Sequence, residues 1–302
     1  MKEQSCLVLG DIFADVTLQA MSMPIPGGRQ PLKKADLRLG GSGCVTALTL
    51  KSLGMPVRLA GNVGDDNLGD YALDQIRRAG LDTSLIQVLP GGQTGFFLTV
   101  LSFGAERTLF TARGVNDQIL PYEPLTSALD TCAHLHISGY MLQGDGQSET
   151  ARRLAESAFG RGLSVSLDPG ACSSQNMPEK VLGLLPWVSF FLPNRAELAS
   201  LTGQNDIDAG LDRLKKDYCG GVALKLDAQG SRYVDGRVDA TVPAEEISSH
   251  ADLGGAGDGF NAGFLYAVLN GKLPKEVLAA GNAMAARLLN SQRGVMDLFS
   301  GK

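Results

Sequence analysis

The sequence Asp252-Leu253-Gly254-Gly255-Ala256-Gly257-Asp258-Gly259-Phe260 is the most informative part of this chain. Apolar residues recur after it at helical spacing until Asn270-Gly271, which predicts a buried helix over Ala256–Leu269. The first N–H groups of such a helix have no partners within it, and Gly255 and Gly257 let an anion approach them without obstruction by a Cβ atom. The stretch therefore predicts an anion site, and phosphate is the expected ligand.

Asp258 lies inside this predicted phosphate site. A carboxylate there would be repelled by phosphate unless a cation screens it or unless it has a proton to remove. We therefore interpret Asp258 as the general base of a phosphoryl transfer. The alternative is a glycine-rich helix N-terminus whose acidic residue is simply favoured by the helix dipole.

The same stretch resembles the second signature of the PfkB, or ribokinase-like, family of carbohydrate and nucleoside kinases, usually written Asp-Thr-Thr-Gly-Ala-Gly-Asp. Leu253 and Gly254 replace the two threonines, and the other positions match. The replaced positions lie next to the monovalent-cation site of potassium-activated members, where Asp252 would be the candidate ligand. The resemblance with this departure predicts weak potassium activation.

Two further segments resemble the family's sugar-binding regions. Residues 10–15 (Gly-Asp-Ile-Phe-Ala-Asp) follow a short apolar strand, where the family carries an acid that holds sugar hydroxyls. Asp15 matches that acid best, and Asp11 is a second candidate in the same loop. A carboxylate suits this task because it can accept hydrogen bonds from two neighbouring hydroxyls. A turn or cap aspartate is the alternative.

Residues 39–47 resemble the first family signature, in which the pair Gly40-Gly41 lets the backbone come close to the sugar. Val45 stands where many members have an asparagine that bonds a ring hydroxyl, so ribose is expected to be a poor substrate. Arg113 could reach a carboxylate or phosphate group on the substrate, or it could be an ordinary surface arginine.

Residues 193–197 match the family's Asn-x-x-Glu motif on the nucleotide side. The spacing puts Asn194 and Glu197 on one face of a first helical turn, where Glu197 can hold magnesium-bound water; plain helix capping is the alternative. The resemblance implies more nucleotide contacts: Lys225 near the phosphates, a turn containing Asp227 and Gly230 over the nucleotide, and Asn282 against the adenine. Asp227 replaces a glycine of the family.

Short apolar strands alternate with amphipathic stretches along the chain, which is typical of a mainly parallel sheet covered by helices on both faces. The resemblance covers essentially the whole chain and implies a three-layer ribokinase-like α/β fold in one domain, residues 1–302. Segments 16–39 and 94–111 break the alternation and resemble the family's small β-lid, through which a homodimer is expected because exposed sheet edges need covering. We expect strands at 6–9, 58–61, 134–138, 164–167, 188–192 and 222–226, and further helices at 150–161 and 277–289.

Composition excludes several classes of function. The 302 residues carry a net charge of −5 and no block of Lys or Arg, which argues against a nucleic-acid partner. The N-terminus is too short and acidic for a signal peptide, and no apolar stretch is long enough to span a bilayer, so a cytoplasmic protein with no membrane partner is expected. The scattered cysteines are expected to be buried thiols in a reducing compartment: Cys6, Cys44, Cys132, Cys172 and Cys219.

The resemblance implies a kinase that uses ATP and Mg²⁺ to phosphorylate a hydroxyl of a sugar, with Asp258 as base and Gly255-Ala256-Gly257 as the anion hole. A nucleoside kinase stays open because a base pocket could be lined by Phe13, Phe96, Phe97 and Phe103. A non-catalytic sugar sensor also stays open, because Val45 and Leu253-Gly254 depart from the pattern. A dinucleotide-dependent oxidoreductase is disfavoured, because no Gly-x-Gly-x-x-Gly follows the first strand.

Overall fold

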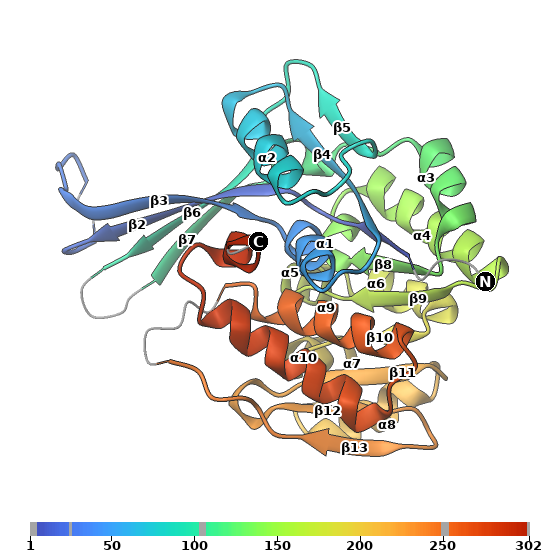
Figure 1. The fold of residues 1–302 in the computed structure, drawn as a ribbon. Helices are drawn as coiled ribbons and strands as arrows, with labels where there is room; N and C mark the ends of the chain where they lie inside the picture. Colours follow the sequence, from blue (N-terminus) through green and yellow to red (C-terminus); the bar gives the residue numbers. More distant parts are fainter. Residues whose placement is uncertain (1–4, 24–25, 103–106, 249–253, 301–302) are drawn as a thin grey trace.

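The computed structural model describes residues 5–23, 26–102, 107–248 and 254–300, and every statement below refers to these residues. Its larger sheet contains nine described strands in the order β13-β12-β11-β10-β9-β8-β1-β4-β5 (Figure 1). The bounds are β1 (Cys6–Leu9), β4 (Val57–Gly64), β5 (Ile86–Leu89), β8 (His134–Ser138), β9 (Ser164–Asp168), β10 (Phe190–Phe191), β11 (Gly221–Lys225), β12 (Ser231–Val234) and β13 (Asp239–Val242).

In this spatial order, all neighbouring strands from β11 through β1 to β5 pair in parallel, whereas β12 and β13 are antiparallel additions at one edge. Parallel neighbours need a long crossover, but antiparallel neighbours need only a short turn. The turn after β11 is the 3₁₀ segment Asp227–Gln229. The sequence interpretation did not include β12 and β13, which have only four residues each.

Helices cover both faces of the sheet. Alternate residues of β1 show the division, since Cys6 and Val8 face one hydrophobic cluster while Leu7 and Leu9 face the other. The first face carries α1 (Ser42–Ser52), α2 (Asn67–Arg78), α9 (Ala256–Leu269) and α10 (Pro274–Leu289), and the second carries α3 (Tyr122–Ala128), α4 (Asp145–Gly160), α5 (Ala171–Asn176), α6 (Pro178–Leu184), α7 (Arg195–Thr202) and α8 (Ile207–Lys215) (Figure 1). The predicted three-layer α/β class is confirmed.

Most element predictions hold to within a few residues. The strands at Cys6–Leu9 and His134–Ser138 and the helix Ala256–Leu269 have the predicted bounds. The helix predicted to start at residue 150 starts instead at Asp145, and the helix predicted from 277 starts at Pro274. The strand predicted at 188–192 is reduced to Phe190–Phe191, because the residues just before it form a 3₁₀ turn containing proline.

A second sheet contains β3 (Leu32–Gly40), β2 (Phe13–Ala20), β6 (Gly95–Leu101) and β7 (Arg107–Ala112), in that order. It extends away from the main body (Figure 1). The segments predicted as a lid, 16–39 and 94–111, supply these strands, although residues 24–25 and 103–106, including Phe103, lie outside the description. β2 begins earlier than predicted, at Phe13.

Glycine backbones pack directly against each other where β1 ends and α1 begins. A Cβ atom on Gly43 would lie 2.4 Å from the Cα of Gly10. Gly41 has a φ of 95°, and a Cβ there would lie 2.4 Å from the carbonyl oxygen of Asp11. The side chain of Asp11 accepts a hydrogen bond from the Gly43 N–H at 3.2 Å. The glycines of this signature therefore let the start of α1 pack directly against the backbone of Gly10 and Asp11.

Two sequence expectations about environment can be compared with the structure. No helix in the described ranges is long and apolar enough to cross a membrane. Cys6, Cys44 and Cys132 are buried, and Cys172 is half-buried. The expectation of a buried thiol is wrong for Cys219, which is exposed in the turn between α8 and β11.

We expect Gly43→Ala to destabilise the protein, because its Cβ would displace the backbone of β1. Overpacking of this kind costs about 1–3 kcal/mol. Gly160→Ala is the matched control, because nothing lies within 4 Å of a Cβ at that helical position; it should instead stabilise by up to about 1 kcal/mol. Urea unfolding measures both changes, and equal stability of the two variants would contradict the close contact.

Candidate functional site

Asp258 lies in the first turn of α9, where it meets the first turn of α1. Its Oδ1 accepts a hydrogen bond of 2.6 Å from the hydroxyl of Ser42, the first residue of α1. Gly255 precedes α9 with a φ of 78°, which is in the left-handed region that favours glycine. The bond joins two helix N-termini. The N–H groups of Gly43 and Cys44 in α1 donate to Asp11, so the anion donors beside Asp258 are expected from the first turn of α9.

A buried ion pair lies beside this meeting point. Lys225 Nζ donates to Asp168 Oδ2 at 3.0 Å and to Asn261 Oδ1 at 3.4 Å, and Asn261 Nδ2 donates back to Asp168 Oδ2. A Cβ on Gly257 would lie 3.5 Å from the Lys225 nitrogen, so the ammonium group faces the first turn of α9. An ammonium group has three hydrogens. These two bonds leave one of them for a further acceptor.

Negative charge outweighs positive charge in this cluster. Although Asp258 keeps part of its surface exposed, burial raises its pKa to about 8, with a further contribution from the charge of Asp168 and opposition from Ser42 and Lys225. Burial and Asp168 also raise the pKa of Glu197 to about 7. Burial is the largest single influence on Asp168 and would raise its pKa, but the charge of Lys225 and the hydrogen bonds from Asn261 and Lys225 together outweigh it, so the pKa of this carboxyl lies below its usual range. A bound cation would stabilise the ionised acids.

Asn194 and Glu197 form a reciprocal cap at the start of α7. Asn194 Oδ1 accepts from the Glu197 N–H at 2.9 Å, and Glu197 Oε2 accepts from the Asn194 N–H at 2.8 Å. The capping alternative for this motif is therefore present in the structure. These bonds use one carboxylate oxygen of Glu197, and the side chain is buried next to the charges of Asp168 and Lys225.

The turn after β11 and the helix α10 together hold the chain that follows β13. Asp227 has a φ of 52°, a conformation that favours glycine and that aspartate tolerates better than most residues. A Cβ on Gly230 would lie 2.0 Å from the Val242 carbonyl oxygen. The Asn282 side-chain amide donates to the carbonyls of Val242 and Pro243 at 3.2 and 2.9 Å. The residue predicted to contact adenine thus already supports this segment through its NH₂ group.

Asp11 and Arg113 lie near each other at the base of the second sheet. Asp11 is buried, which raises its pKa, and the charge of Arg113 opposes this shift. Arg113 donates through Nε to Asp117 at 2.6 Å and through Nη2 to the Tyr140 carbonyl at 3.1 Å. Its guanidinium lies 5.9 Å from the centre of the Phe13 ring. Arg113 is therefore a held side chain and not a freely moving surface arginine.

Asp15 is placed by strand register on the polar face of the second sheet. It pairs with Arg38 of β3 and with Phe97 of β6. Phe13 lies two residues before Asp15 and so shares this face, and its ring stacks on Phe97 at 4.2 Å. Because Arg113 lies over the same Phe13 ring, Asp15 and Arg113 are on one side of the sheet.

Tyr140 is a site residue that the sequence interpretation did not identify. Its ring lies against Gly170, where an added Cβ would be 3.0 Å from Cε2. Burial is the main cause that raises the pKa of its phenol, followed by the charges of Asp168, Asp11 and Asp258. The hydroxyl therefore lies among the acids contributed by several strand ends. No sequence motif marked this residue.

Ser42 and Asn261 were also missed as site residues, and Asp168 was not assigned a role. Ser42 occupies an unassigned position of a recognised signature, and Asp168 ends an expected strand. Asn261 lies one turn after Asp258 on α9, so its helical spacing could have identified it. The predicted cation ligand Asp252 and the substituted Leu253 lie outside the described residues. Of the expected cation site, the structure describes Gly254, which is exposed.

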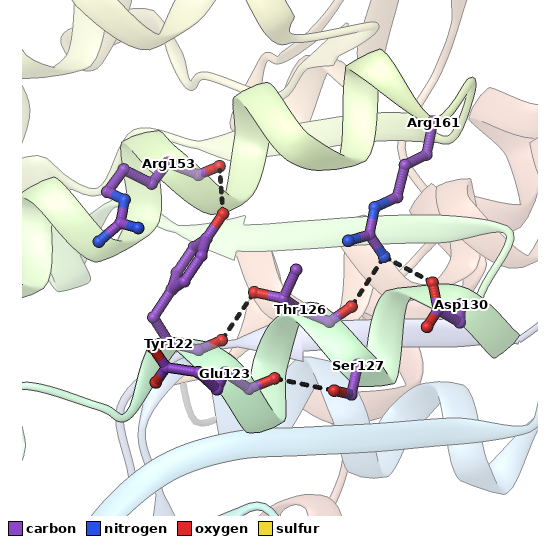
Figure 2. A pocket seen from close by; sticks show the side chains of 7 residues that line it. All are labelled: Tyr122, Glu123, Thr126, Ser127, Asp130, Arg153 and Arg161. Atoms are coloured by element: carbon purple, nitrogen blue, oxygen red, sulfur yellow. Dashed lines mark hydrogen bonds and ion pairs between the residues drawn. The ribbon is translucent and has the colours of Figure 1, made fainter.

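A separate groove lies between α3 and α4, and none of the predicted site residues lines it (Figure 2). Arg161 donates to the Thr126 carbonyl at 2.8 Å and to Asp130 at 2.7 Å. The Arg153 guanidinium lies 4.0 Å from the centre of the Tyr122 ring. Both arginines of the groove therefore already contact other residues that line it.

Comparisons with known proteins agree with one another. Residues 3–296 match the model of the family described as pfkB family carbohydrate kinase. The chain is 26% identical over 281 residues to the ATP-dependent ribose-1-phosphate kinase of Halopiger xanaduensis, with 93% of this chain and 90% of that protein covered. It is 25% identical over 270 residues to the 2-dehydro-3-deoxygluconokinase of Bacillus subtilis, with 86% and 83% covered.

The fold also matches a solved structure. The ribokinase of Arabidopsis thaliana, determined with ribose and ATP, superimposes with a TM-score of 0.84 at 19% identity, and all of each chain is covered. At this identity the likeness concerns the fold alone. The predicted ribokinase-like fold is confirmed.

We expect Asp258→Asn to stabilise the folded protein at alkaline pH. The pKa of Asp258 in the folded protein is about 8, above its ordinary value of 3.8. Its contribution to stability is therefore fully present below about pH 4 and is lost as the pH rises through about 8. The variant should match the parent near pH 4 and exceed it near pH 9, by on the order of 1–3 kcal/mol.

Thermal unfolding at several pH values between 4 and 9 measures this difference. Asp65→Asn, at an exposed position, is the control that should show no such divergence. Identical melting temperatures of parent and Asp258→Asn at pH 9 would contradict a raised pKa.

Proposed function

The chain belongs to the pfkB family of carbohydrate kinases, and on that premise we propose that it transfers the γ-phosphoryl group of ATP to a hydroxyl of an anionic sugar. The observation that carries this proposal is the meeting of Asp258, the spare hydrogen of Lys225 and the first turn of α9. This arrangement puts a proton acceptor beside a group of anion donors, which are the two functions that such a transfer requires.

In the proposed reaction, Asp258 takes the proton of the sugar hydroxyl. The hydroxyl oxygen then bonds to the γ-phosphorus as the bond from that phosphorus to the bridging oxygen breaks, and ADP leaves. The backbone N–H groups of Gly255, Ala256 and Gly257 stabilise charge on the moving phosphoryl group. Lys225 adds a fixed positive charge next to Gly257. Because Asp258 must be ionised, activity should increase as the pH rises toward its pKa of about 8.

Glu197 fits the role of a magnesium-binding residue that acts through water. It is a buried acid with one oxygen outside the capping bonds, and a nearby cation would favour its ionised form. Mg²⁺ would neutralise charge on the ATP phosphates. Asn194 would hold Glu197 in place through the cap.

The adenosine part of ATP would lie beside the chain held by Gly230 and Asn282, with Asp227 at the turn above it. These residues fix the backbone of Val242 and Pro243 between β12 and α10. We assign them a supporting role in nucleotide binding through this backbone.

The sugar would lie between Asp11, Gly40-Gly41 and the polar face of the second sheet. Asp15 lies on that face and would accept sugar hydroxyls. The bonds of Arg113 use Nε and Nη2, so Nη1 can reach an anionic group on the sugar. The names of two relatives, a ribose-1-phosphate kinase and a 2-dehydro-3-deoxygluconokinase, also point to anionic sugars.

Val45 supports the same view of specificity. It packs between the two helix N-termini, with its Cγ1 3.5 Å from a Cβ position on Gly255. A ring hydroxyl buried against this side chain would go unpaired, at a cost of about 1–3 kcal/mol. Neutral ribose should therefore be a poor substrate.

The first test is a coupled assay of ADP formation with ribose, a ketohexose, a 2-keto-3-deoxy sugar acid, a sugar phosphate and a nucleoside. We expect the anionic sugars to be turned over best. Asp258→Asn should lower turnover by at least about 100-fold while nucleotide affinity is kept. Turnover within a few-fold of the parent would rule out Asp258 as the base, and a nucleoside as the best substrate would favour the alternative kinase class.

We also propose that all residues form one domain in which the second sheet acts as a lid and pairs with the lid of a second copy. One row of its side chains crosses all four strands and is apolar: Leu37, Val16, Leu98 and Phe110. Leu37 and Phe110 are 42% and 55% exposed. A contiguous apolar face of this kind is typical of an interface.

We expect the protein to be a dimer that Phe110→Asp converts to a monomer. Phe159→Asp is the control, because Phe159 is similarly exposed, at 52%, but lies on α4. Sedimentation velocity at micromolar concentration measures both. A monomeric parent protein, or a dimer that survives Phe110→Asp, would contradict pairing through this face.

A further inference from the structure

A row of buried polar side chains crosses β8 and β9 behind the candidate site. The strands pair His134 with Ser164, His136 with Ser166 and Ser138 with Asp168, so these side chains share one face of the sheet. His134 Nδ1 bonds to Ser164 Oγ, His134 Nε2 to Ser166 Oγ, and His136 Nδ1 to the same Ser166 Oγ, each at 2.7 Å. The row is a continuous hydrogen-bonded chain that leads toward Asp168.

The row carries no charge at neutral pH. His134 and His136 are fully buried, and burial lowers their pKa values to about 3 and about 4. Each neutral imidazole has one N–H group and one acceptor nitrogen. The Ser166 hydroxyl has one hydrogen and contacts both imidazoles, so within the row it can donate either to His136 Nδ1 or to His134 Nε2. If it donates to His136 Nδ1, the hydrogen of the His136 imidazole must be on Nε2, at the end of the row. If it donates to His134 Nε2, every hydrogen bond of the row is reversed and His136 Nε2 carries no hydrogen.

The row of hydrogen bonds ends at His136 Nε2, on the side of Asp168. This nitrogen is shielded from solvent and has no hydrogen-bond partner in the described part of the chain. Asp168 is its diagonal neighbour, two residues beyond the paired Ser166, which is within reach of a long side chain. The charge of Asp168 also acts on His136. A carboxylate at this end favours the direction in which Nε2 carries the hydrogen.

Asp168 has room for such a donor. Its Oδ2 accepts from Lys225 and Asn261, whereas its Oδ1 accepts from the Gly170 N–H at 3.1 Å. A carboxylate offers about four lone-pair sites. Among the residues that the structure describes, these bonds leave one acceptor site on Oδ1.

We propose that His136 is a positioning residue whose Nε2–H group supports the Asp168 carboxylate and thereby holds the Lys225 ammonium beside the first turn of α9. His136 would act on nucleotide binding only through Asp168 and Lys225, and it would not touch a substrate. Its effect on phosphate binding rests on the proposed function, but its effect on Lys225 does not.

Two substitutions separate the two ends of the imidazole. His136→Asn places its amide near Nδ1, so it can keep the bond to Ser166 but cannot reach toward Asp168. His136→Gln extends its amide to the position of Nε2. We expect His136→Asn to weaken binding of ATP with Mg²⁺ by about 10-fold, which is the loss expected when a polar interaction with a charged group is removed. His136→Gln should stay within about threefold, and the KM for the sugar should hardly change in either variant.

The ¹⁵Nζ signal of Lys225 in the ligand-free protein provides a readout independent of nucleotide. Its assignment follows from its loss in Lys225→Met. A held ammonium exchanges its hydrogens slowly, so protection should be kept in His136→Gln and lost in His136→Asn. Equal behaviour of the two variants, in affinity or in protection, would overturn the proposal. A parent protein that binds no ATP would contradict the proposed function instead, and the Lys225 signal would still decide the role of His136.

Discussion

The close backbone contact between Gly10 and Gly43 is the constraint on which the site depends. It brings the N-terminus of α1 onto the carboxyl end of β1, an interior strand of the parallel region between β8 and β4. That position sets where Ser42 meets Asp258 and therefore where α1 and α9 point their N–H groups. It also sets where β3 ends and α1 begins, which ties the second sheet to the main sheet. A side chain at either glycine would separate these parts.

The electrostatics of the site work against the stability of the empty protein. Burial and the charge of Asp168 raise the pKa values of Asp258 and Glu197, and Lys225 is a cation placed among these acids. The buried pair of Lys225 and Asp168 is favourable chiefly because Asn261 and Gly170 satisfy the remaining polar atoms. This arrangement is stable enough to fold, yet it holds unfavourable negative charge that a bound cation would relieve.

Sequence reasoning reached the fold class and the position of Asp258, because both depend on local patterns. The alternation of short apolar segments with amphipathic ones identified β1 and β8, and glycine spacing with helical period identified α9 at its observed bounds. The antiparallel β12 and β13 were too short for a periodic signal, and the strand expected at 188–192 proved to be only Phe190–Phe191.

The partners within the site were less accessible to prediction. The contacts of Asp168 with Lys225 and Asn261 join β9, β11 and α9 across intervals of 57 and 93 residues, and no local pattern encodes them. The motif of Asn194 and Glu197 is a different case. Its local spacing was recognised in the sequence, but the same spacing suits both a helix cap and a metal site, so the sequence could not decide between them. The roles of the other predicted site residues remain predictions that only ligand contacts can test.

The support given by α10 has a consequence for the order in which the molecule can be assembled during translation. Asn282 holds the chain at Val242 and Pro243, and Asn290 accepts a hydrogen bond from the Ser248 N–H at 2.8 Å. Both ends of residues 242–248 therefore depend on α10 and its C-cap, which are among the last parts of the chain to be synthesised. β1, the first strand to emerge from the ribosome, is an interior strand of the sheet, between β8 and β4. A nascent chain can therefore build the sheet early, but it completes the wall beside α9 only when almost the whole polypeptide has been released.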